Sequence, residues 1–508
     1  MDNSAVQDGD AAGTFFGHPK GLFVLFFAEM WERFSYYGMR ALLIFYLTQH
    51  WLFSDEKSAI IYGAYTALVY ITPVIGGYLA DRYLGQRKAV LYGAVLLTFG
   101  HLLMGVEGAG GQDTASLNVF WLALAFIIVG SGFLKANISV IVGQLYPRTD
   151  VRRDGAYTIF YMGINLGAAL GAIVCGWLGQ TYGWSYGFGA AGIGMIAGLL
   201  VFIWGKPLLL GRGEAPDPVR LATPVAGIKF EWLLYAVGLV AVGVVWWMVQ
   251  NQEVVGTLLG VAGAILVGYV LFTAVTKLDA HARNRIFAAM FLIIGSILFW
   301  ALFEQAGSSL NLYTDRYVDR AGVPASVFQS VNAIYIVLLA PFFAALWTWL
   351  GRRGLEPSAP AKFGLAMVQL GAGFLVLVAG AAASGGMTPV LFIFLIYLLH
   401  TTGELCLSPV GLSAMNRLAP AHMASLIMGT WFFASATGNF VAGLIAQATG
   451  SEAASGDGAG QQTVLDVYSQ IGWIAIGVGV AVLIISPLIK KLMHLDTLSD
   501  DAASETAH

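Results

Sequence analysis

Long apolar runs recur from one end of the chain to the other, and they restrict it to a membrane fold. About fourteen of these runs are long enough for a helix to cross the roughly 30 Å hydrocarbon core of a bilayer. Because 58% of the 508 residues are hydrophobic and only 11% are charged, a soluble fold could not cover this much apolar surface. We therefore predict an all-α integral membrane protein. The expected spans lie near residues 20–48, 58–80, 88–107, 117–146, 155–178, 185–205, 230–250, 254–276, 286–310, 327–351, 361–384, 388–413, 422–449 and 464–490.

Basic residues are distributed unevenly between the loops that join these spans. If the N-terminus is cytoplasmic, twenty Lys and Arg residues fall in inner loops and tails, whereas only Lys57, Arg316 and Arg320 fall in outer loops. This asymmetry matches the positive-inside rule. The polar N-terminal stretch MDNSAVQDGDAAG lacks the basic start and cleavage site of a signal peptide, so the first span should stay uncleaved. We expect a multi-pass protein of the cell (inner) membrane with both termini in the cytoplasm.

Two basic stretches, at residues 206–229 and 277–285, bracket the seventh and eighth spans and suggest an order of six spans, an inserted pair and six more. The expected parts are a cytoplasmic N-terminal tail (1–19), an N-terminal six-helix bundle (20–205), linkers with the inserted pair (206–285), a C-terminal six-helix bundle (286–490) and a cytoplasmic C-terminal tail (491–508).

Small residues recur every fourth position in the fifth span of each half, which supports two related halves. The matching sets are Gly163, Gly167 and Gly171 in the first half and Ala434, Gly438 and Ala442 in the second. Such spacing lets helices approach closely, although generic Gly and Ala packing explains either span alone equally well. The loop GYLADRYLGQRKA after the second span resembles the loop that marks the major facilitator superfamily. That resemblance implies two six-helix halves facing each other around a mid-membrane site.

Seven charged residues interrupt the expected spans at depth. They are Glu29, Glu32, Arg33, Arg40 and Lys135 in the first half and Glu304 and Glu404 in the second. Facing lipid, they would together cost on the order of 20 kcal/mol. Because buried ion pairs are poor stabilisers compared with apolar packing, a function explains these charges better than structure alone. The first half carries the excess of positive charge and the second adds two acids, so a central cavity would suit a dipolar ligand.

The first span carries the densest of these polar clusters, EMWERFSYYGMR. At about 100° per residue, its charged and tyrosine side chains fall within about 140° of one another on one helix face. The cluster resembles the E-x-x-E-R-F-x-Y-Y motif of the proton-coupled oligopeptide transporter family, and FYMGINLG resembles the fifth-helix signature of that family. Further similar segments are GFLKANIS, FWALFEQ, QSVNAIYI, GELCLSPVGLS and MGTWFFASATGN. The resemblance runs from about residue 14 to 494 and includes the helix pair found in bacterial members.

This resemblance implies a proton-coupled symporter that imports di- and tripeptides by alternating access. It assigns the peptide carboxylate to Arg33 and Lys135, with Tyr37 nearby. It assigns the peptide ammonium to Asn165, Asn332 and Glu404. The pocket-lining positions that it implies are Tyr36, Tyr70, Trp300, Trp431 and Ser435, for any one of which packing or an interfacial belt is the alternative.

The resemblance also makes Arg40 and Glu304 an extracellular gate pair, and Arg40 is one of the expected peptide-binding residues as well. Glu304 is a candidate proton site, and so are Glu29 and Glu32, which share a helix face with Arg33. Protonating Glu29 or Glu32 could free Arg33 for the substrate or pass the proton to Lys135, so we count Arg33 and Lys135 among the proton-coupling residues. The sequence does not decide which glutamate takes the proton. His400 lies one turn before Glu404 and could tune it, but we expect a core histidine whose hydrogen bonds are satisfied.

Other functional classes have weaker support. We find no catalytic or metal-binding motif and no phosphate-binding loop, so we expect neither an enzyme nor a cofactor or metal site. The net charge of −3 and the lack of a dense basic patch argue against nucleic acid, and no obligate protein partner is indicated. A transporter of another zwitterion or of an anion such as nitrate, or a peptide sensor that does not transport, remains the alternative.

Overall fold

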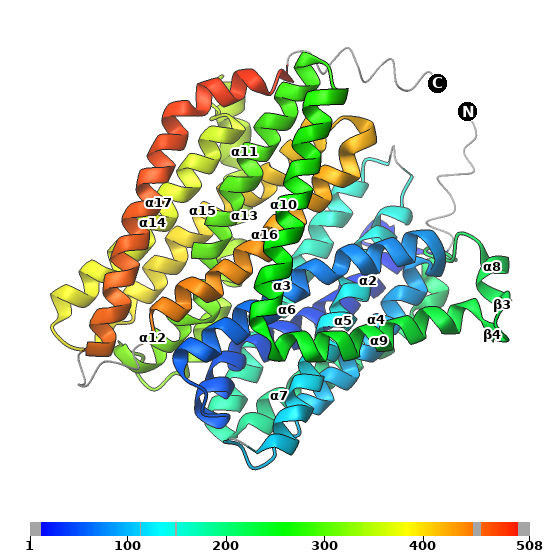
Figure 1. Ribbon diagram of the computed structural model, residues 1–508, viewed down its shortest axis with the longest axis horizontal. Coiled ribbons are helices and arrows are strands. Elements are labelled where there is room, and N and C mark those ends of the chain that lie inside the picture. The colour runs from blue at the N-terminus through cyan, green and yellow to red at the C-terminus, as the bar shows by residue number, and fades with distance from the viewer. Residues whose placement is uncertain (1–11, 112, 148–149, 451–458, 496–508) are drawn as a thin grey trace. The chain divides into compact units, whose positions relative to one another are not determined.

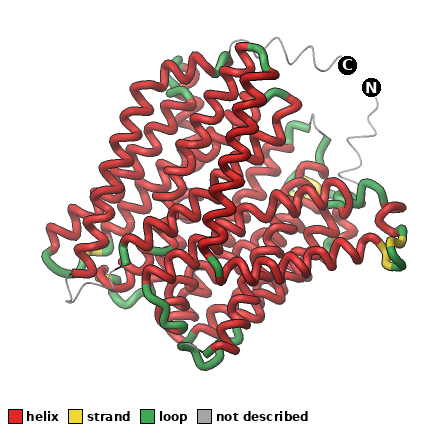
Figure 2. Tube along the Cα trace, in the orientation of Figure 1, coloured by secondary structure: helices red, strands yellow, loops and turns green. Residues whose placement is uncertain are grey.

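The computed structural model describes residues 12–111, 113–147, 150–450 and 459–495. Helices make up nearly all of the described chain, and strands are confined to a few residues in loops (Figure 2). The ends of the two expected tails, residues 1–11 and 496–508, lie outside the described residues.

Fourteen helices of at least nineteen residues occur in the described part of the chain, as the apolar runs predict. The first six are α2 (Lys20–Phe45), α3 (Asp55–Leu79), α4 (Gln86–Met104), α5 (Thr114–Gln144), α6 (Arg153–Tyr182) and α7 (Trp184–Trp204). The next two are α9 (Phe230–Gln250) and α10 (Gln252–Lys277). The last six are α11 (Ala280–Phe303), α13 (Ser330–Arg352), α14 (Ala359–Ser384), α15 (Leu391–Leu418), α16 (Ala424–Ala448) and α17 (Ala459–Leu492).

Length and hydropathy identify eleven candidate membrane spans in the described chain. Helix α2 is not among them, because every window of membrane-spanning length within it contains Glu29, Glu32 and Arg33. The helix that carries the most polar cluster is therefore among the three long helices that length and hydropathy miss, the other two being α4 and α16.

Short elements connect these helices. The short helices are α8 (Pro218–Ala222) and α12 (Ser309–Tyr317), the π-helical turns are Tyr46–His50 and Ala80–Leu84, and the 3-10 turns are Lys206–Leu209, Glu304–Gly307, Ala325–Gln329 and Ala421–Met423. Two antiparallel pairs, β1 (Thr14–Phe15) with β2 (His18–Pro19) and β3 (Pro224–Val225) with β4 (Ile228–Lys229), and one parallel pair, β5 (Val318–Asp319) with β6 (Thr388–Pro389), complete the fold.

The chain forms two compact units. Unit 1 contains residues 1–255, 306–316 and 320–337, and unit 2 contains residues 256–305, 317–319 and 338–508. In unit 1, α2 packs on α6 and α7, and α9 packs on α5. In unit 2, α14 packs between α15 and α17, as the yellow and red helices of Figure 1 show, and α11 packs on α16. The division into six, two and six spans remains a prediction.

A seam of small residues brings α2 and α6 together in unit 1. A Cβ added at Gly163 would lie 2.9 Å from the ring of Phe26, and one at Gly167 would lie 3.0 Å from the Cβ of Arg33. Additional Cβ atoms at Gly167 and Gly171 would also collide with backbone carbonyl oxygens of α2. We call Gly163, Gly167 and Gly171 the glycine seam. Only glycine lets the two backbones approach this closely.

A small residue also allows two helices of the second half to approach closely. A Cβ added at Gly438 of α16 would lie 2.9 Å from the Cβ of Trp300 and 3.1 Å from the carbonyl oxygen of Ile297, both on α11. In each half, small residues of the fifth span thus pack against the first span. This correspondence supports the predicted relation between the halves.

Residues 306–316 and 320–337 come from the second half of the sequence but are part of unit 1. Asn311 donates to the carbonyl oxygen of Ala41 at 3.1 Å, and the Ser326 hydroxyl donates to Gln180 Oε1 at 2.7 Å. Helix α13 begins in this segment and leaves unit 1 after Val337, four residues before Pro341. The apolar pattern of the sequence gave no indication of this packing.

Candidate functional site

The polar face of α2 carries a buried ion cluster. Arg33 Nε lies 2.8 Å from Glu29 Oε1, to which it donates a hydrogen bond, and 2.9 Å from Glu32 Oε2. All three side chains are buried, and Glu32 has no solvent exposure. The cluster forms because positions 29, 32 and 33 share one face of the helix, as the spacing predicts.

Glu32 is the least satisfied member of the cluster. Both of its carboxylate oxygens are buried and lack a hydrogen-bond partner in the described part of the chain, although Arg33 lies within ion-pair distance. Oε2 of Glu29 is also unpartnered. Leaving a buried acceptor without a hydrogen bond costs about 1–3 kcal/mol, and more for a charged group. The arrangement therefore contains one cation shared by two acids, and one of these acids is poorly stabilised.

The glycine seam holds this cluster in place. Gly167 of α6 lies directly against Met30 and Arg33, so the backbone of α6 forms the wall behind the arginine. A larger residue would push Arg33 away from α6. Helix α6 therefore sets the position of the Arg33 side chain.

Lys135 of α5 lies beside the cluster but makes no ion pair within 4 Å among the described residues. Its ammonium is 4.0 Å from the centre of the Tyr70 ring and 5.7 Å from that of Tyr36. Lys135 is half-buried. Since its charge is held over aromatic rings and not neutralised by an acid, it can receive an anionic group.

Arg40 sits further along the same face of α2. Its Nε donates to Tyr62 Oη at 2.6 Å, and its guanidinium lies 5.8 Å from the centre of the Tyr37 ring. Arg40 is buried, whereas Tyr37 is half-buried and packs against Ala168 and Ala333.

Two asparagines assigned to the ammonium end both belong to unit 1. Asn165 of α6 is buried and donates from Nδ2 to the carbonyl oxygen of Tyr161 at 3.1 Å, which leaves its Oδ1 as an acceptor. Asn332 lies half-buried near the start of α13, next to Ala333, which packs on Ala168 and Ala169 of α6. The structure therefore brings Asn332 into the first unit although it comes from the second half of the sequence.

The remaining predicted residues lie in unit 2. Glu304 is buried and directly follows α11, and Trp300 of α11 has a buried Nε1 without a hydrogen-bond partner among the described residues. Glu404 of α15 is half-buried. Trp431 and Ser435 are buried on α16, where the Ser435 hydroxyl donates to the Trp431 carbonyl oxygen at 3.3 Å. Because Arg40 and Glu304 belong to different units, their pairing as a gate stays a prediction.

His400 is a core residue. Its Nε2 lies 3.0 Å from the carbonyl oxygen of Leu370, and its ring contacts Phe374 edge-on at 4.8 Å. This contact agrees with the expectation of a histidine whose hydrogen bonds are satisfied.

Sequence reasoning missed two tyrosines of α3. Tyr62 receives the hydrogen bond of Arg40, and Tyr65 is buried with a hydroxyl that no described residue bonds. Tyr36 likewise has a buried hydroxyl without a partner. The polar spacing of Tyr62, Tyr65 and Tyr70 within an otherwise apolar span could have revealed this face.

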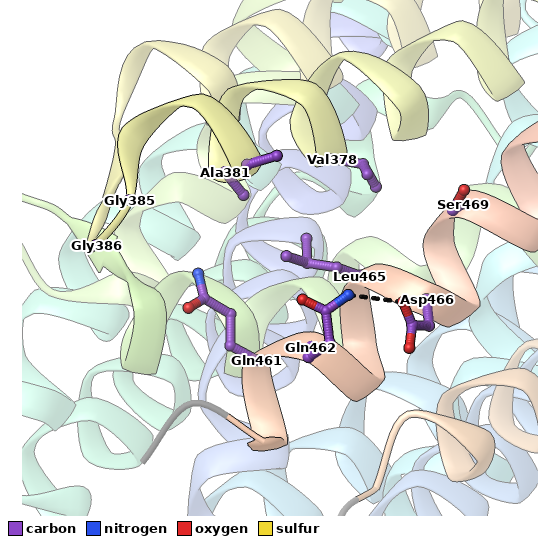
Figure 3. Close-up of a pocket in the computed structure, with 10 residues that line it drawn as sticks. Val378, Ala381, Gly385, Gly386, Gln461, Gln462, Leu465, Asp466 and Ser469 are labelled. Carbon is purple, nitrogen blue, oxygen red and sulfur yellow. Dashed lines mark hydrogen bonds between the residues drawn. The ribbon is translucent and has the colours of Figure 1, made fainter.

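A cavity of 310 Å³ opens between α14 and α17 in unit 2 (Figure 3). It is lined by Val378, Ala381, Leu465 and several small or amide residues, and Gln462 donates to Asp466 at 2.7 Å. None of the predicted site residues lines it. This cavity is therefore not the candidate site.

The chain is similar to known proteins over most of its length. A family model described as "POT family" matches residues 87–465. The chain is 37% identical to the "Uncharacterized transporter YclF" of Bacillus subtilis (strain 168), over 97% of this chain and 99% of that protein. It is 36% identical to the "Peptide transporter YePEPT" of Yersinia enterocolitica subsp. palearctica, over 85% of this chain and 88% of that protein.

Two solved structures are similar over nearly their whole length. One is the peptide transporter POT in complex with sulfate, with a TM-score of 0.83 and 36% identity over 97% of this chain and 99% of that one. The other is a POT family transporter in complex with a thioalcohol conjugated peptide, with a TM-score of 0.80 and 31% identity over 94% and 98% of the two chains.

Proposed function

Because this chain belongs to the POT family, we propose that it is a proton-coupled symporter that imports di- and tripeptides by alternating access. The family assignment and the structural matches confirm the predicted major facilitator fold and a multi-pass membrane protein. Relatives named as peptide transporters support peptides as the substrate, and their transport activity points away from an enzyme.

The observation that carries the proposal is the position of Arg33 between Glu29 and Glu32. A guanidinium offers donors that match a carboxylate. While both glutamates are ionised, they compete with a substrate for these donors. A proton on Glu32 would remove one competitor and its uncompensated buried charge. Proton uptake would thereby free Arg33 to bind the carboxylate of a peptide.

Lys135 supplies the second cation for the same carboxylate. It is held only by contacts with aromatic rings in the described chain, so it can approach an anion without breaking an ion pair. The acceptor groups of Asn165, Asn332 and Glu404 suit the ammonium end of a peptide. A zwitterion therefore fits this set of charges better than an anion such as nitrate.

Coupling to one proton supplies enough energy for accumulation. Moving one proton down about 100 mV and one pH unit releases ~2.3 plus ~1.4 kcal/mol. This energy would concentrate a neutral peptide roughly 500-fold. We propose that the protein works in the cell's inner membrane with both termini in the cytoplasm, without a cofactor or an obligate protein partner.

Uptake of labelled dialanine into proteoliposomes tests the proposal. We expect accumulation above the external concentration when the outside is acidic, and its collapse when a protonophore is added. Liposomes without protein and the variant Arg33→Gln, which should bind dialanine weakly, serve as controls. Equilibration without accumulation would contradict proton coupling, and binding of dialanine without any uptake would favour a sensor.

A further inference from the structure

A second cavity lies in unit 1, where α5 ends and α6 begins. Its volume is 650 Å³, and the turn formed by residues 211–214 closes one side of it. None of the residues assigned to the peptide site lines it. This cavity is therefore separate from the residues assigned to the peptide site.

Two arginines of this cavity have no hydrogen-bond or ion-pair partner among the residues that the structure describes. Arg153 begins α6 and Arg212 lies in the closing turn, and the Nε of each is buried without a hydrogen bond. Neither guanidinium forms an ion pair with a described residue. Each arginine as a whole is only half-buried, but its Nε donor is not reached by solvent. Buried donors in proteins are normally paired, so two unpaired donors in one cavity point to an acceptor that binds between them.

Glu214, the acidic residue that lines the cavity, already forms an ion pair with Arg87. Glu214 accepts two hydrogen bonds from Arg87, at 2.5 Å from Nε and 3.1 Å from Nη2. These bonds lower the pKa of Glu214, which therefore stays ionised and neutralises Arg87. Lys206 and Lys88 lie near enough to Glu214 to act on it as well. The local charge thus remains positive, because Lys88 pairs with Glu231 whereas Arg153, Arg212 and Lys206 have no ion pair among the described residues.

The hydroxyl of Tyr157 lies at the same place as the guanidinium of Arg153, next to Gly143. A Cβ placed on Gly143 would lie 2.5 Å from Tyr157 Oη and 3.1 Å from Arg153 Nη2. Because Gly143 has no side chain, the Tyr157 hydroxyl and the Arg153 guanidinium can both lie against α5 at this position. The Tyr157 hydroxyl is held only by a long contact of 3.4 Å to the carbonyl oxygen of Ser139, so it can turn to an anion.

We propose that this cavity binds a phosphate group, either free phosphate or the phosphate of an acidic phospholipid headgroup. Two arginines and a tyrosine supply forked and single donors that match the geometry of phosphate oxygens. Val140 and Tyr157, each more than one-third exposed, would give a lipid chain an apolar edge beside the site. A bound phosphate would join the turn of residues 211–214 to the start of α6. The site does not depend on which substrate the protein transports.

The test uses the full-length purified protein in detergent with two probes. Inorganic phosphate is titrated by calorimetry, and phosphatidylglycerol, with phosphatidylcholine as the reference lipid, is followed by native mass spectrometry. The variants are R153Q/R212Q and, because Arg212 lies outside any helix, R212Q alone. The matched control is R352Q, which removes an exposed arginine at the end of α13.

We expect wild type and R352Q to bind at least one probe saturably, and R153Q/R212Q to bind it about tenfold or more weakly. Binding of phosphatidylglycerol alone would identify a lipid headgroup site, and binding of inorganic phosphate would identify a site for the free anion. R212Q should give a smaller loss with an unchanged elution profile. Equal affinity of wild type and R212Q, or no binding of either probe, would overturn the proposal.

Discussion

Replacing Gly167 by alanine tests whether the glycine seam positions the peptide site. The added methyl group would lie 3.0 Å from the Cβ of Arg33 and closer still to the carbonyl oxygen of Met30. Carbon atoms pack best at about 3.5–4.0 Å, so α2 and α6 must separate by about 1 Å. Overpacking of this kind typically costs about 1–3 kcal/mol. Arg33 would move with its helix.

We expect two measurable effects of Gly167→Ala. The purified protein should unfold at a lower temperature, as followed by the loss of its monodisperse elution peak after heating. The kcat/KM for dialanine uptake should fall by about tenfold or more, because a misplacement of about 1 Å can lower a rate by up to about 100-fold.

A matched control is Gly477→Ala on α17, where an added Cβ would meet no atom within 4 Å. This change should keep uptake at the wild-type level, and it should slightly stabilise the helix because alanine favours helices more than glycine does. If Gly167→Ala behaved like Gly477→Ala in both assays, the seam could not be what positions Arg33.

Three further substitutions test separate parts of the proposal. Glu32→Gln should keep dialanine binding, because Arg33 loses a competitor, but should lower gradient-driven accumulation; accumulation equal to that of wild type would exclude Glu32 as the proton site. Glu304→Gln should keep exchange of labelled for unlabelled peptide and lose accumulation driven by a proton gradient, and undiminished accumulation would refute its role in coupling. His400→Leu should leave the pH profile of uptake unchanged while lowering stability by about 0.5–1.5 kcal/mol through the lost contact with Leu370, and a shifted profile would show that His400 titrates during transport.

The sequence predicted the helices and the polar face of α2 because both depend on local periodicity. The spacing of Glu29, Glu32 and Arg33 places them on one face of any helix, and the structure shows them in contact. The spacing of Gly163, Gly167 and Gly171 likewise predicted a close helix contact, although not which helix would be the partner.

The sequence could not predict how the charges are shared. Lys135 lies over Tyr70 and not against an acid, and this depends on the rotamers and on the packing of α3 against α5. The packing of Asn332 in unit 1 depends on contacts between residues far apart in the sequence, which no local pattern encodes. The roles of the predicted site residues remain predictions that the uptake assays can test.

Helix α13 belongs to unit 1 up to Val337 and to unit 2 from Leu338 onward. Pro341 has no backbone N–H, so the carbonyl oxygen of Val337 lacks its normal helical partner four residues later. The hydrogen bond that proline removes from α13 is therefore one of the four helical bonds that would cross the boundary between the units, the other three joining the N–H groups of residues 338–340 to the carbonyl oxygens of residues 334–336. The backbone of α13 is therefore held by one hydrogen bond fewer where it passes from one unit to the other, and a proline at such a point is the usual cause of a bend in a helix.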